Sequence, residues 1–257
     1  MDLELSDHVV IVSSAGRGIG LATVQALVAE GAKVVGGDLD VSALQDGDVV
    51  AVQADLGTAE GCEQLVQAAV DAHGRVDGLV NCLGLMADRP EGFLSVTDEQ
   101  WLRTIELNLL SAIRCTRAAV PAMLRGGGGA VVNVSSSAGR EPFWRCPDYA
   151  VSKSALTTLT KALSMEFGPK GIRCNAVMPG PTTTPGFVED SKRRAEEAGV
   201  SLEEMIEEFS VKRRRMALPQ PGAPEDVAPA ILFLLSGPAR QVTGSEYRVD
   251  GGAIQHI

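Results

Sequence analysis

The amino-acid sequence predicts an α/β fold, with a doubly wound parallel sheet of about seven strands and helices on both faces. Short runs rich in β-branched residues alternate along the chain with longer amphipathic stretches, an order typical of βαβ units. The chain has 257 residues, of which 45% are hydrophobic, which is enough for one large core. We expect a single domain over residues 1–257, because no repeat or linker divides the sequence.

The first half of the chain shows four strand patterns, each followed by turn residues. In chain order, the expected strands and helices of this half are His8–Ser13, Gly18–Glu30 (helix), Lys33–Asp38, Val49–Ala54, Thr58–His73 (helix) and Gly78–Cys82. Thr97, Asp98, Glu99 and Gln100 form a capping-box sequence. This sequence predicts the start of a helix that runs towards Leu124, followed by a glycine loop at 126–129.

The second half continues the alternation and then departs from it. The expected strands and helices are Ala130–Ser135, Asp148–Phe167 (helix), Arg173–Met178, Pro224–Leu235 (helix) and Glu246–Val249. Residues 185–221 are charged and framed by prolines, and they are too few to hold a core of their own. We therefore expect a lid over the substrate there. Its basic cluster at 212–215 follows four glutamates, which predicts a solvated face.

Composition excludes several classes of protein. The net charge of −10 argues against nucleic acid or an anionic membrane as a partner, and no apolar run is long enough to span a bilayer. The N-terminal residues are acidic, unlike a secretory or transit leader. The five cysteines are scattered without a Cys-x-x-Cys pair, and the three histidines share no ligand spacing. We expect reduced thiols in the cytoplasm and no metal site.

Tyr149 and Lys153 are candidates for proton transfer. At this spacing in a helix they lie one turn apart on the same face, so the ammonium is expected to lower the pKa of the phenol. Ser136 follows a strand pattern and can bring a hydroxyl to the same site. The three side chains together can bind a carbonyl oxygen and exchange a proton with it. Taken alone, a Tyr-x-x-x-Lys pair is also common on helix surfaces.

A glycine-rich turn joins the first strand to its helix at residues 13–20. Such a turn lets the backbone approach a pyrophosphate at the helix N-terminus, although a tight turn without a ligand has the same composition. Asp38, eighteen positions after Gly20, ends the second strand, where a carboxylate accepts hydrogen bonds from the adenosine ribose. It would also repel a 2′-phosphate, Leu39 is not basic, and Arg17 is the nearby cation. We expect NAD rather than NADP.

These motifs, in this order, resemble those of the short-chain dehydrogenase/reductase family, and the resemblance runs from Ser13 to Gly252. It implies a Rossmann-like fold and a nicotinamide cofactor. The resemblance, with the charge argument for Arg17, implies these cofactor contacts: Ser14, Arg17, Gly18, Ile19 and Gly20 in the turn, Asp38, Asp55 and Leu56 after the second and third strands, Asn81 and Gly84 after the fourth, Tyr149 and Lys153 in the helix, and Pro179, Gly180, Thr182 and Thr184 after the sixth.

The resemblance also implies roles in hydride transfer between the cofactor and a secondary alcohol or ketone. Tyr149 would be the general base, or the acid in the reverse direction, and Lys153 would lower its pKa and hold the nicotinamide ribose. Ser136 would orient the substrate oxygen, and Asn108 would support a proton-relay water. A homotetramer or homodimer is implied as well, with the helices of Asn108 and Tyr149 at the contacts.

Four positions depart from the family pattern. Ser14 replaces the first motif glycine and tolerates fewer backbone conformations, Cys82 and Leu83 replace an Asn-Ala pair, and Thr182 stands where an aliphatic residue is common. None of them is a proton-transfer residue. Two alternatives stay open: an NADP-dependent ketoreductase, distinguished by Asp38, and a protein that binds NAD as a sensor or scaffold without turnover.

The segment between the serine and the tyrosine is expected to line the substrate pocket. Phe143 and Trp144 favour an apolar or cyclic substrate, although they could also pack beneath the lid. Phe187 belongs to the lid and is expected to close over the substrate, although its apolar spacing with Met205, Ile206 and Phe209 could equally form an interface. Arg140 or Arg145 could bind a carboxylate or could face solvent.

Overall fold

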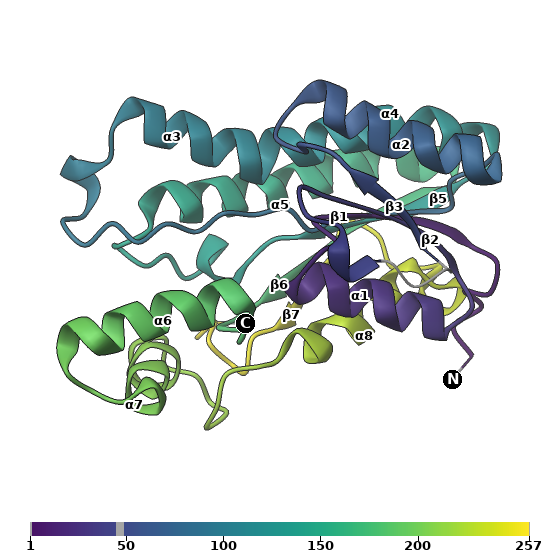
Figure 1. Cartoon of the computed structure of the whole chain (residues 1–257). Helices are drawn as coiled ribbons and strands as arrows, with labels where there is room; N and C mark the ends of the chain where they lie inside the picture. Colours follow the sequence, from purple (N-terminus) through teal and green to yellow (C-terminus); the bar gives the residue numbers. More distant parts are fainter. Residues whose placement is uncertain (1, 45–48, 257) are drawn as a thin grey trace.

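The computed structural model describes residues 2–44 and 49–256, and a parallel sheet of seven strands lies at its centre (Figure 1). The strand order is β3-β2-β1-β4-β5-β6-β7, and every neighbouring pair is parallel. The strands are β1 (Val9–Ser13), β2 (Lys33–Asp38), β3 (Val49–Gln53), β4 (Gly78–Asn81), β5 (Gly129–Val134), β6 (Ile172–Pro179) and β7 (Glu246–Val249). This architecture confirms the predicted fold class.

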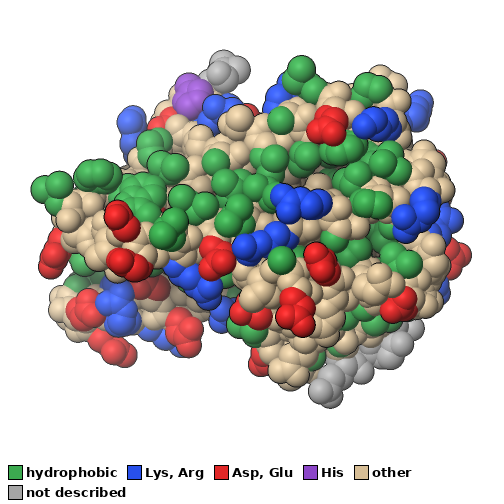
Figure 2. All heavy atoms as spheres, turned by 90° about the horizontal axis from the view of Figure 1, so that it is seen from above, with side chains coloured by type: hydrophobic (Ala, Val, Ile, Leu, Met, Phe, Trp, Pro, Cys, Tyr) green, Lys and Arg blue, Asp and Glu red, His purple; other side chains and the backbone are tan. Residues whose placement is uncertain are grey.

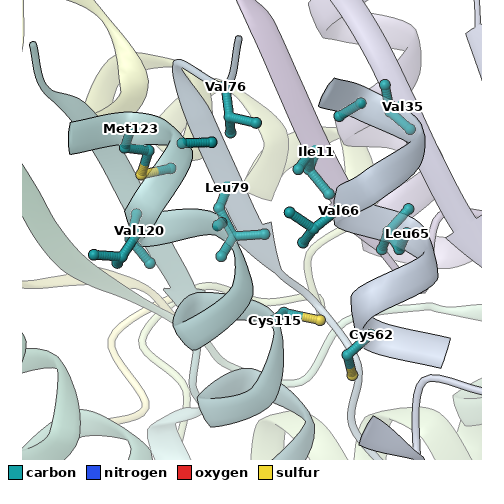
Figure 3. Packing of buried hydrophobic residues seen from close by; sticks show 14 of the residues in the cluster. Ile11, Val35, Cys62, Leu65, Val66, Val76, Leu79, Cys115, Val120 and Met123 are labelled. Carbon is teal, nitrogen blue, oxygen red and sulfur yellow. The ribbon is translucent and has the colours of Figure 1, made fainter. Parts of the chain in front are cut away.

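Helices cover both faces of the sheet, as Figure 1 shows. On one face lie α2 (Ala59–His73), α4 (Ser111–Arg125) and α5 (Pro147–Phe167), and on the other lie α1 (Gly18–Ala29) and α8 (Pro224–Leu235). Each face has its own cluster of buried side chains. In the first cluster, Leu65 and Val66 of α2 and Met123 of α4 pack against Ile11 and Leu79 of the sheet (Figure 3).

Most predicted elements begin and end within two residues of their observed bounds, and α8 and β7 match theirs. The helix predicted from Thr97 towards Leu124 is wrong as one regular helix. It comprises α3 (Asp98–Ile105), a π-helical segment at Glu106–Leu110 and then α4, with the predicted capping box at Thr97 present. Periodicity could not reveal one widened turn inside an otherwise helical pattern. Gly129, predicted to end a loop, begins β5.

The order of the sheet places the candidate site. The strand order reverses at β1, which has β2 as its neighbour on one side and β4 on the other. A reversal of this kind creates a crevice beyond the carboxyl ends of the strands. Several short 3-10 turns connect the elements, at Ser42–Leu44, Phe93–Ser95, Ser137–Gly139, Gly168–Lys170 and Gly237–Ala239. Within residues 2–44 and 49–256, none of the helices combines the length and hydropathy that a membrane span requires.

The segment predicted as a lid forms two helices and a π-helical turn. These are α6 (Pro185–Ala198), α7 (Leu202–Glu207) and the π segment Glu208–Arg213. Figure 1 shows α6 and α7 on the side of the molecule away from the N-terminus. Arg194 of α6 forms an ion pair with Asp88, 3.4 Å away in the loop after β4, which ties this segment to the body of the protein.

Candidate active site

A cavity of about 790 Å³ occupies the crevice at the carboxyl ends of the strands, between the sheet and the segment of α6 and α7. Its size suits a ligand of the size of a dinucleotide together with a small substrate. The glycine-rich turn after β1, the ends of β2, β4, β5 and β6, and the first turns of α5 all reach it. Residues far apart in sequence therefore meet in one site.

The glycine-rich turn can hold a phosphate group. A Cβ at Gly20 would overlap the Ser14 carbonyl oxygen, and one at Gly16 would overlap the Asp40 carbonyl oxygen, so both positions need glycine. Ser14 itself has a positive φ of 53°. Arg17, at the N-cap of α1, makes no side-chain bond to the first helical turn. Among the residues that the structure describes, the N–H groups of Gly18, Ile19 and Gly20 meet no side-chain acceptor and can bind an anion.

The carboxylates after β2 and β3 line the other end of the cavity. Asp38 Oδ2 accepts hydrogen bonds from the Gly16 N–H at 3.0 Å and the Ser14 hydroxyl at 3.4 Å, and its Oδ1 accepts from the Leu39 N–H at 2.7 Å. The serine that replaces the motif glycine therefore contacts the carboxylate expected to bind ribose. Further along, Asp55 Oδ1 accepts from the Gly57 N–H at 2.9 Å.

The remaining residues predicted to contact a cofactor divide into two groups. The lining of the cavity includes Gly18, Ile19, Leu56, Gly84, Pro179, Gly180, Thr182 and Thr184. Asn81 is absent from it, because its Nδ2 donates to Thr116 Oγ1 at 3.0 Å and to Asn133 Oδ1 at 2.8 Å inside the fold. The structure thus gives Asn81 a place in the core, between β4, β5 and α4.

Tyr149 and Lys153 lie in the first turns of α5 and both line the cavity, as does Ser136. The Lys153 ammonium is 5.8 Å from the centre of the Tyr149 ring and donates to the Val134 carbonyl oxygen at 2.8 Å. A Cβ at Gly84 would come within 2.9 Å of this nitrogen, so glycine leaves the room that the lysine needs.

The predicted lowering of the tyrosine pKa is wrong for this structure. Burial raises the pKa of Tyr149 to about 12, against the opposing effects of a hydrogen bond with Ser136 and the charge of Arg214. Burial also lowers the pKa of Lys153 to about 8. The two residues lie one helical turn apart as expected, but the loss of solvent around the phenol outweighs the opposing effects of Ser136 and Arg214 on its pKa.

Asn108 lies in the interior next to the cavity and links two segments that line it. It is fully buried in the π-helical segment, where its Oδ1 accepts from the Leu85 N–H at 2.6 Å. Its Nδ2 donates to the Leu85 carbonyl oxygen at 3.0 Å and to the Ser152 hydroxyl at 2.9 Å. Asn108 does not line the cavity. It joins the loop after β4 to the helix that carries the tyrosine.

The substrate end of the cavity has an aromatic wall. Phe143 and Phe187 both line it, and both pack on Phe209, with ring centres 6.0 Å and 5.8 Å apart. The prediction that Trp144 lines the pocket is wrong, because this side chain is 61% exposed and lies outside the cavity. Adjacent residues in an irregular loop point in different directions, and only one of the two aromatic rings faces inward.

Most of the basic residues around the substrate end lie outside the cavity. Arg140 pairs with Glu246 and Arg145 with Asp88, and neither arginine lines the cavity. The cluster at 212–215 was predicted to be solvated, and Lys212 and Arg213 are indeed exposed and paired with glutamates. Arg214 is the exception, since it is half-buried and lines the cavity. No pattern in the sequence distinguishes it from its basic neighbours.

Thiol chemistry does not compete with the tyrosine here. The cysteines at 62, 82, 115, 146 and 174, all within the described ranges, are free. Cys146 and Cys82 line the cavity, but burial raises their pKa values to about 11 and about 12, respectively. Both are therefore protonated near neutrality, and a protonated thiol is a poor nucleophile.

The fold and this site define an oxidoreductase that uses a nicotinamide cofactor, and the chain belongs to the short-chain dehydrogenase/reductase family. Residues 14–253 match the family model described as "Enoyl-(Acyl carrier protein) reductase". Among curated relatives, L-rhamnose 1-dehydrogenase (NAD(P)(+)) of Azotobacter vinelandii is 36% identical over 267 residues, covering 98% of this chain and 99% of the relative. Cyclohexanol dehydrogenase of an Acinetobacter species is 34% identical over 260 residues, covering 98% and 96%.

A solved structure shows the same similarity in three dimensions. L-sorbose reductase from Gluconobacter frateurii, complexed with NADPH and L-sorbose, has a TM-score of 0.93 and 29% sequence identity, with 100% of both chains covered. The relatives thus include proteins named for sugars and for a cyclic alcohol. Their names do not agree on a substrate or on one nicotinamide cofactor.

Proposed function

We propose that this chain is an NAD-dependent oxidoreductase that transfers a hydride between the cofactor and a secondary alcohol or ketone with an apolar or cyclic body. One observation carries the proposal: Ser136, Tyr149 and Lys153 share a single cavity with the glycine-rich turn and Asp38. The turn fits a pyrophosphate, because its glycines leave room for close approach and the first N–H groups of α1 meet no side-chain acceptor within the described residues. When bound, the nicotinamide ring would accept or supply the hydride.

In this proposal the side chains hold the reacting oxygen and move its proton. Ser136 donates a hydrogen bond to the oxygen, and Tyr149 takes the proton from an alcohol or gives one to a ketone. Lys153 lies beside the tyrosine ring and binds the nicotinamide ribose. Asn108 holds the loop after β4 against α5, and through that contact it supports the path by which the proton reaches solvent.

The pKa of the tyrosine sets the expected pH dependence. Because burial raises this pKa to about 12, the phenol is neutral near pH 7 and is ready to protonate a ketone. Oxidation of an alcohol needs the phenolate, whose fraction grows with pH. We therefore expect the rate of oxidation to rise as the pH increases from 7 to 10, while the rate of reduction does not rise.

Asp38 supports NAD over NADP, because its carboxylate is fixed by the turn and would repel a 2′-phosphate. The NADPH-bound structure of L-sorbose reductase and the position of Arg17 in the cavity wall favour the second candidate, an NADP-dependent ketoreductase. Asp38→Asn separates the two, since the amide oxygen can still accept from the Gly16 N–H but carries no charge. We expect this change to improve kcat/KM for NADP by about tenfold or more. An unchanged preference would remove Asp38 from the assignment.

We also propose one catalytic domain over residues 1–257, with residues 185–221 as its lid and with a homotetramer or homodimer as the working form. The cytoplasm is the proposed location, because free thiols persist in a reducing compartment. The ion pair between Asp88 and Arg194 supports the lid, as it joins α6 to the loop beside the cavity.

The test is the formation of reduced nicotinamide, followed by its absorbance, with secondary alcohols, cyclic alcohols, sugars, sterols and dihydrodiols. NAD and NADP are supplied in parallel, and Tyr149→Phe is the control, because it keeps the ring and removes the proton carrier. We expect this variant to lose turnover by about 100-fold or more while it still binds NAD in calorimetry. Undiminished turnover would refute the role of Tyr149. Tight NAD binding without turnover of any alcohol would instead support a sensor.

A further inference from the structure

Arg214 is placed at the substrate end of the cavity without a carboxylate to neutralise it. It follows the π-helical segment Glu208–Arg213, and it lines the cavity together with Tyr149 and the aromatic wall. Within residues 2–44 and 49–256, Arg214 has no ion pair within 4.0 Å. The one hydrogen bond of its side chain within those ranges, from Nη2 to the Ser137 hydroxyl, is long at 3.4 Å.

The neighbouring arginines, unlike Arg214, form ion pairs with carboxylates. Arg140 and Arg145 each pair with one carboxylate, and Arg193 and Arg194 of α6 each pair with two. A guanidinium has several N–H donors in a rigid plane, and Arg214 uses only one of them. Burial also disfavours its charge and lowers its pKa. A guanidinium nevertheless stays protonated at neutral pH. A half-buried cation with free donors is stabilised by an anion that enters the cavity.

The surroundings of Arg214 indicate which anion fits. Glu141 and Asp250 act on the guanidinium from beyond ion-pair distance, and their negative charges would repel a dianion. One planar guanidinium matches one planar carboxylate, which it can bind through two parallel hydrogen bonds. Phe143 and Phe187 form an apolar wall at this end together with Phe209. Glu189 and Asp190 of α6 also line the cavity, and Asp190 is already paired with Arg193 and Arg194.

The position of the contact links this anion to the reaction. The Ser137 hydroxyl that meets Arg214 follows Ser136 directly in the chain, and Ser136 is the residue proposed to hold the reacting oxygen. We propose that Arg214 binds a carboxylate of the substrate, and that the substrate is therefore a hydroxy acid, or the corresponding keto acid, with an apolar ring-sized body. This inference rests on the proposed function, which it deepens by naming the class of substrate.

The experiment compares alcohols that carry either a carboxylate or an uncharged methyl group at the same ring position. The 2-, 3- and 4-hydroxycyclohexanecarboxylates are each paired with the corresponding methylcyclohexanol, and kcat/KM is measured with NAD for the parent, Arg214→Gln and Arg213→Gln. The last is the control, since Arg213 is exposed and paired with Glu208 outside the cavity. We expect the ratio of kcat/KM for the best acid to that for its neutral partner to fall by about 100-fold in R214Q. In R213Q the ratio should stay within about threefold of the parent.

The ratio separates recognition of the substrate from a general effect on the tyrosine. The charge of Arg214 also lowers the pKa of Tyr149, so its removal can slow the oxidation of both alcohols. That effect cancels in the ratio. An equal loss for the acid and for the neutral alcohol would overturn the proposal, and so would a parent enzyme that does not prefer any of the acids.

A binding measurement keeps the inference testable even if no alcohol is oxidised, an outcome that would refute the proposed function alone. Calorimetry with cyclohexanecarboxylate and with cyclohexyl phosphate, in the presence of NAD, reports on the anion site directly. Binding of the carboxylate that weakens about tenfold or more in R214Q but not in R213Q supports the proposal. Absence of carboxylate binding, equal binding by R214Q, or tighter binding of the phosphate would overturn it.

Discussion

Lys153 is a charged residue in the interior, 2% exposed, with the Val134 carbonyl oxygen as its hydrogen-bond acceptor. Its pKa of about 8 in the folded protein lies below the ordinary 10.5, so keeping the ammonium in the fold costs about 3 kcal/mol at pH 7. Lys153→Met removes the charge and keeps the length of the side chain. We expect the variant without cofactor to unfold at a higher temperature than the parent at pH 7, and to lose turnover by about 100-fold.

The sign of this effect follows from proton binding. Between the folded pKa and the unfolded pKa of Lys153, the unfolded chain binds more protons, so the stability of the parent rises with pH across that window. The advantage of K153M should therefore be complete below about pH 8 and should vanish near pH 10.5. Calorimetric unfolding across this range measures it, with the exposed Lys161→Met on the same helix as the control. A lower unfolding temperature for K153M at pH 7 would contradict the argument.

At the scale of single residues, the sequence predicts which side chains come close together, but it does not predict how deeply each of them is buried. The sequence predicts that Tyr149 and Lys153, one helical turn apart, lie beside Ser136 at a strand end, and all three line the same cavity. The direction of the tyrosine pKa shift depends on how much water the fold excludes, which the sequence does not reveal. Arg214 stands among four consecutive basic residues, and only the path of the backbone after the π-helical segment turns it inward.

The first turn of α5 is held by a buried ion pair. Asp148, which precedes Tyr149, is fully buried, and its Oδ2 accepts from Arg89 Nη2 and from the Thr104 hydroxyl, each at 2.7 Å. Burial alone would raise the pKa of this carboxyl, but the hydrogen bonds from Arg89 and Thr104 lower it. The carboxylate thus joins α5 to α3 and to the loop after β4, and it sets the position of the helix that carries Tyr149.

Asp148→Asn is expected to destabilise the protein by about 3 kcal/mol, because it leaves the Arg89 charge buried without its partner. Urea unfolding at pH 7 measures the loss, with the exposed Asp71→Asn in α2 as a control. Because the folded pKa of Asp148 is lowered, its contribution is present above the ordinary value of 3.8 and is lost as the pH falls below it. The difference between parent and D148N should therefore shrink on acidification. A difference that stays constant from pH 7 to pH 3 would show that the charge is not responsible.

Helices and strands with a clear hydrophobic periodicity in the sequence could be predicted, whereas those shaped by tertiary contacts could not. The alternation of β-branched strands and amphipathic helices gave the parallel sheet, and proline with acidic residues gave the start of α8. The π-helical turn at Glu106–Leu110 has ordinary helical residues. It widens the helix where Asn108 reaches the Leu85 backbone, a contact that depends on a loop distant in sequence.

The whole molecule leaves an apolar helical face exposed on the side of α4 and α5. Figure 2 views the protein from this side and shows hydrophobic side chains gathered in patches across it. Val151 and Met165 of α5 are 52% and 70% exposed, and their spacing of fourteen residues places them on one face of the helix. Leu124 of α4 is 40% exposed. Exposed apolar patches of this kind favour an interface between protein chains.

This face leads to a prediction about assembly. If a second copy of the chain covers α4 and α5, then a charge at Met165 would be buried without a partner, and the assembly should dissociate. We expect light scattering after gel filtration to give the parent a mass that is a multiple of 26.9 kDa, and Met165→Glu a smaller multiple. Val200→Glu, 43% exposed in the parent and located after α6, adds the same charge away from this face and should leave the mass unchanged. A parent that is monomeric, or a Met165→Glu variant of unchanged mass, would rule out this face as the interface. Tyr149 lies on the same helix, α5, so the activity of the dissociated variant is informative. Dissociation with full activity would show that the site is complete within one chain. Dissociation with loss of turnover would show that α5 needs the second copy to hold the tyrosine in place.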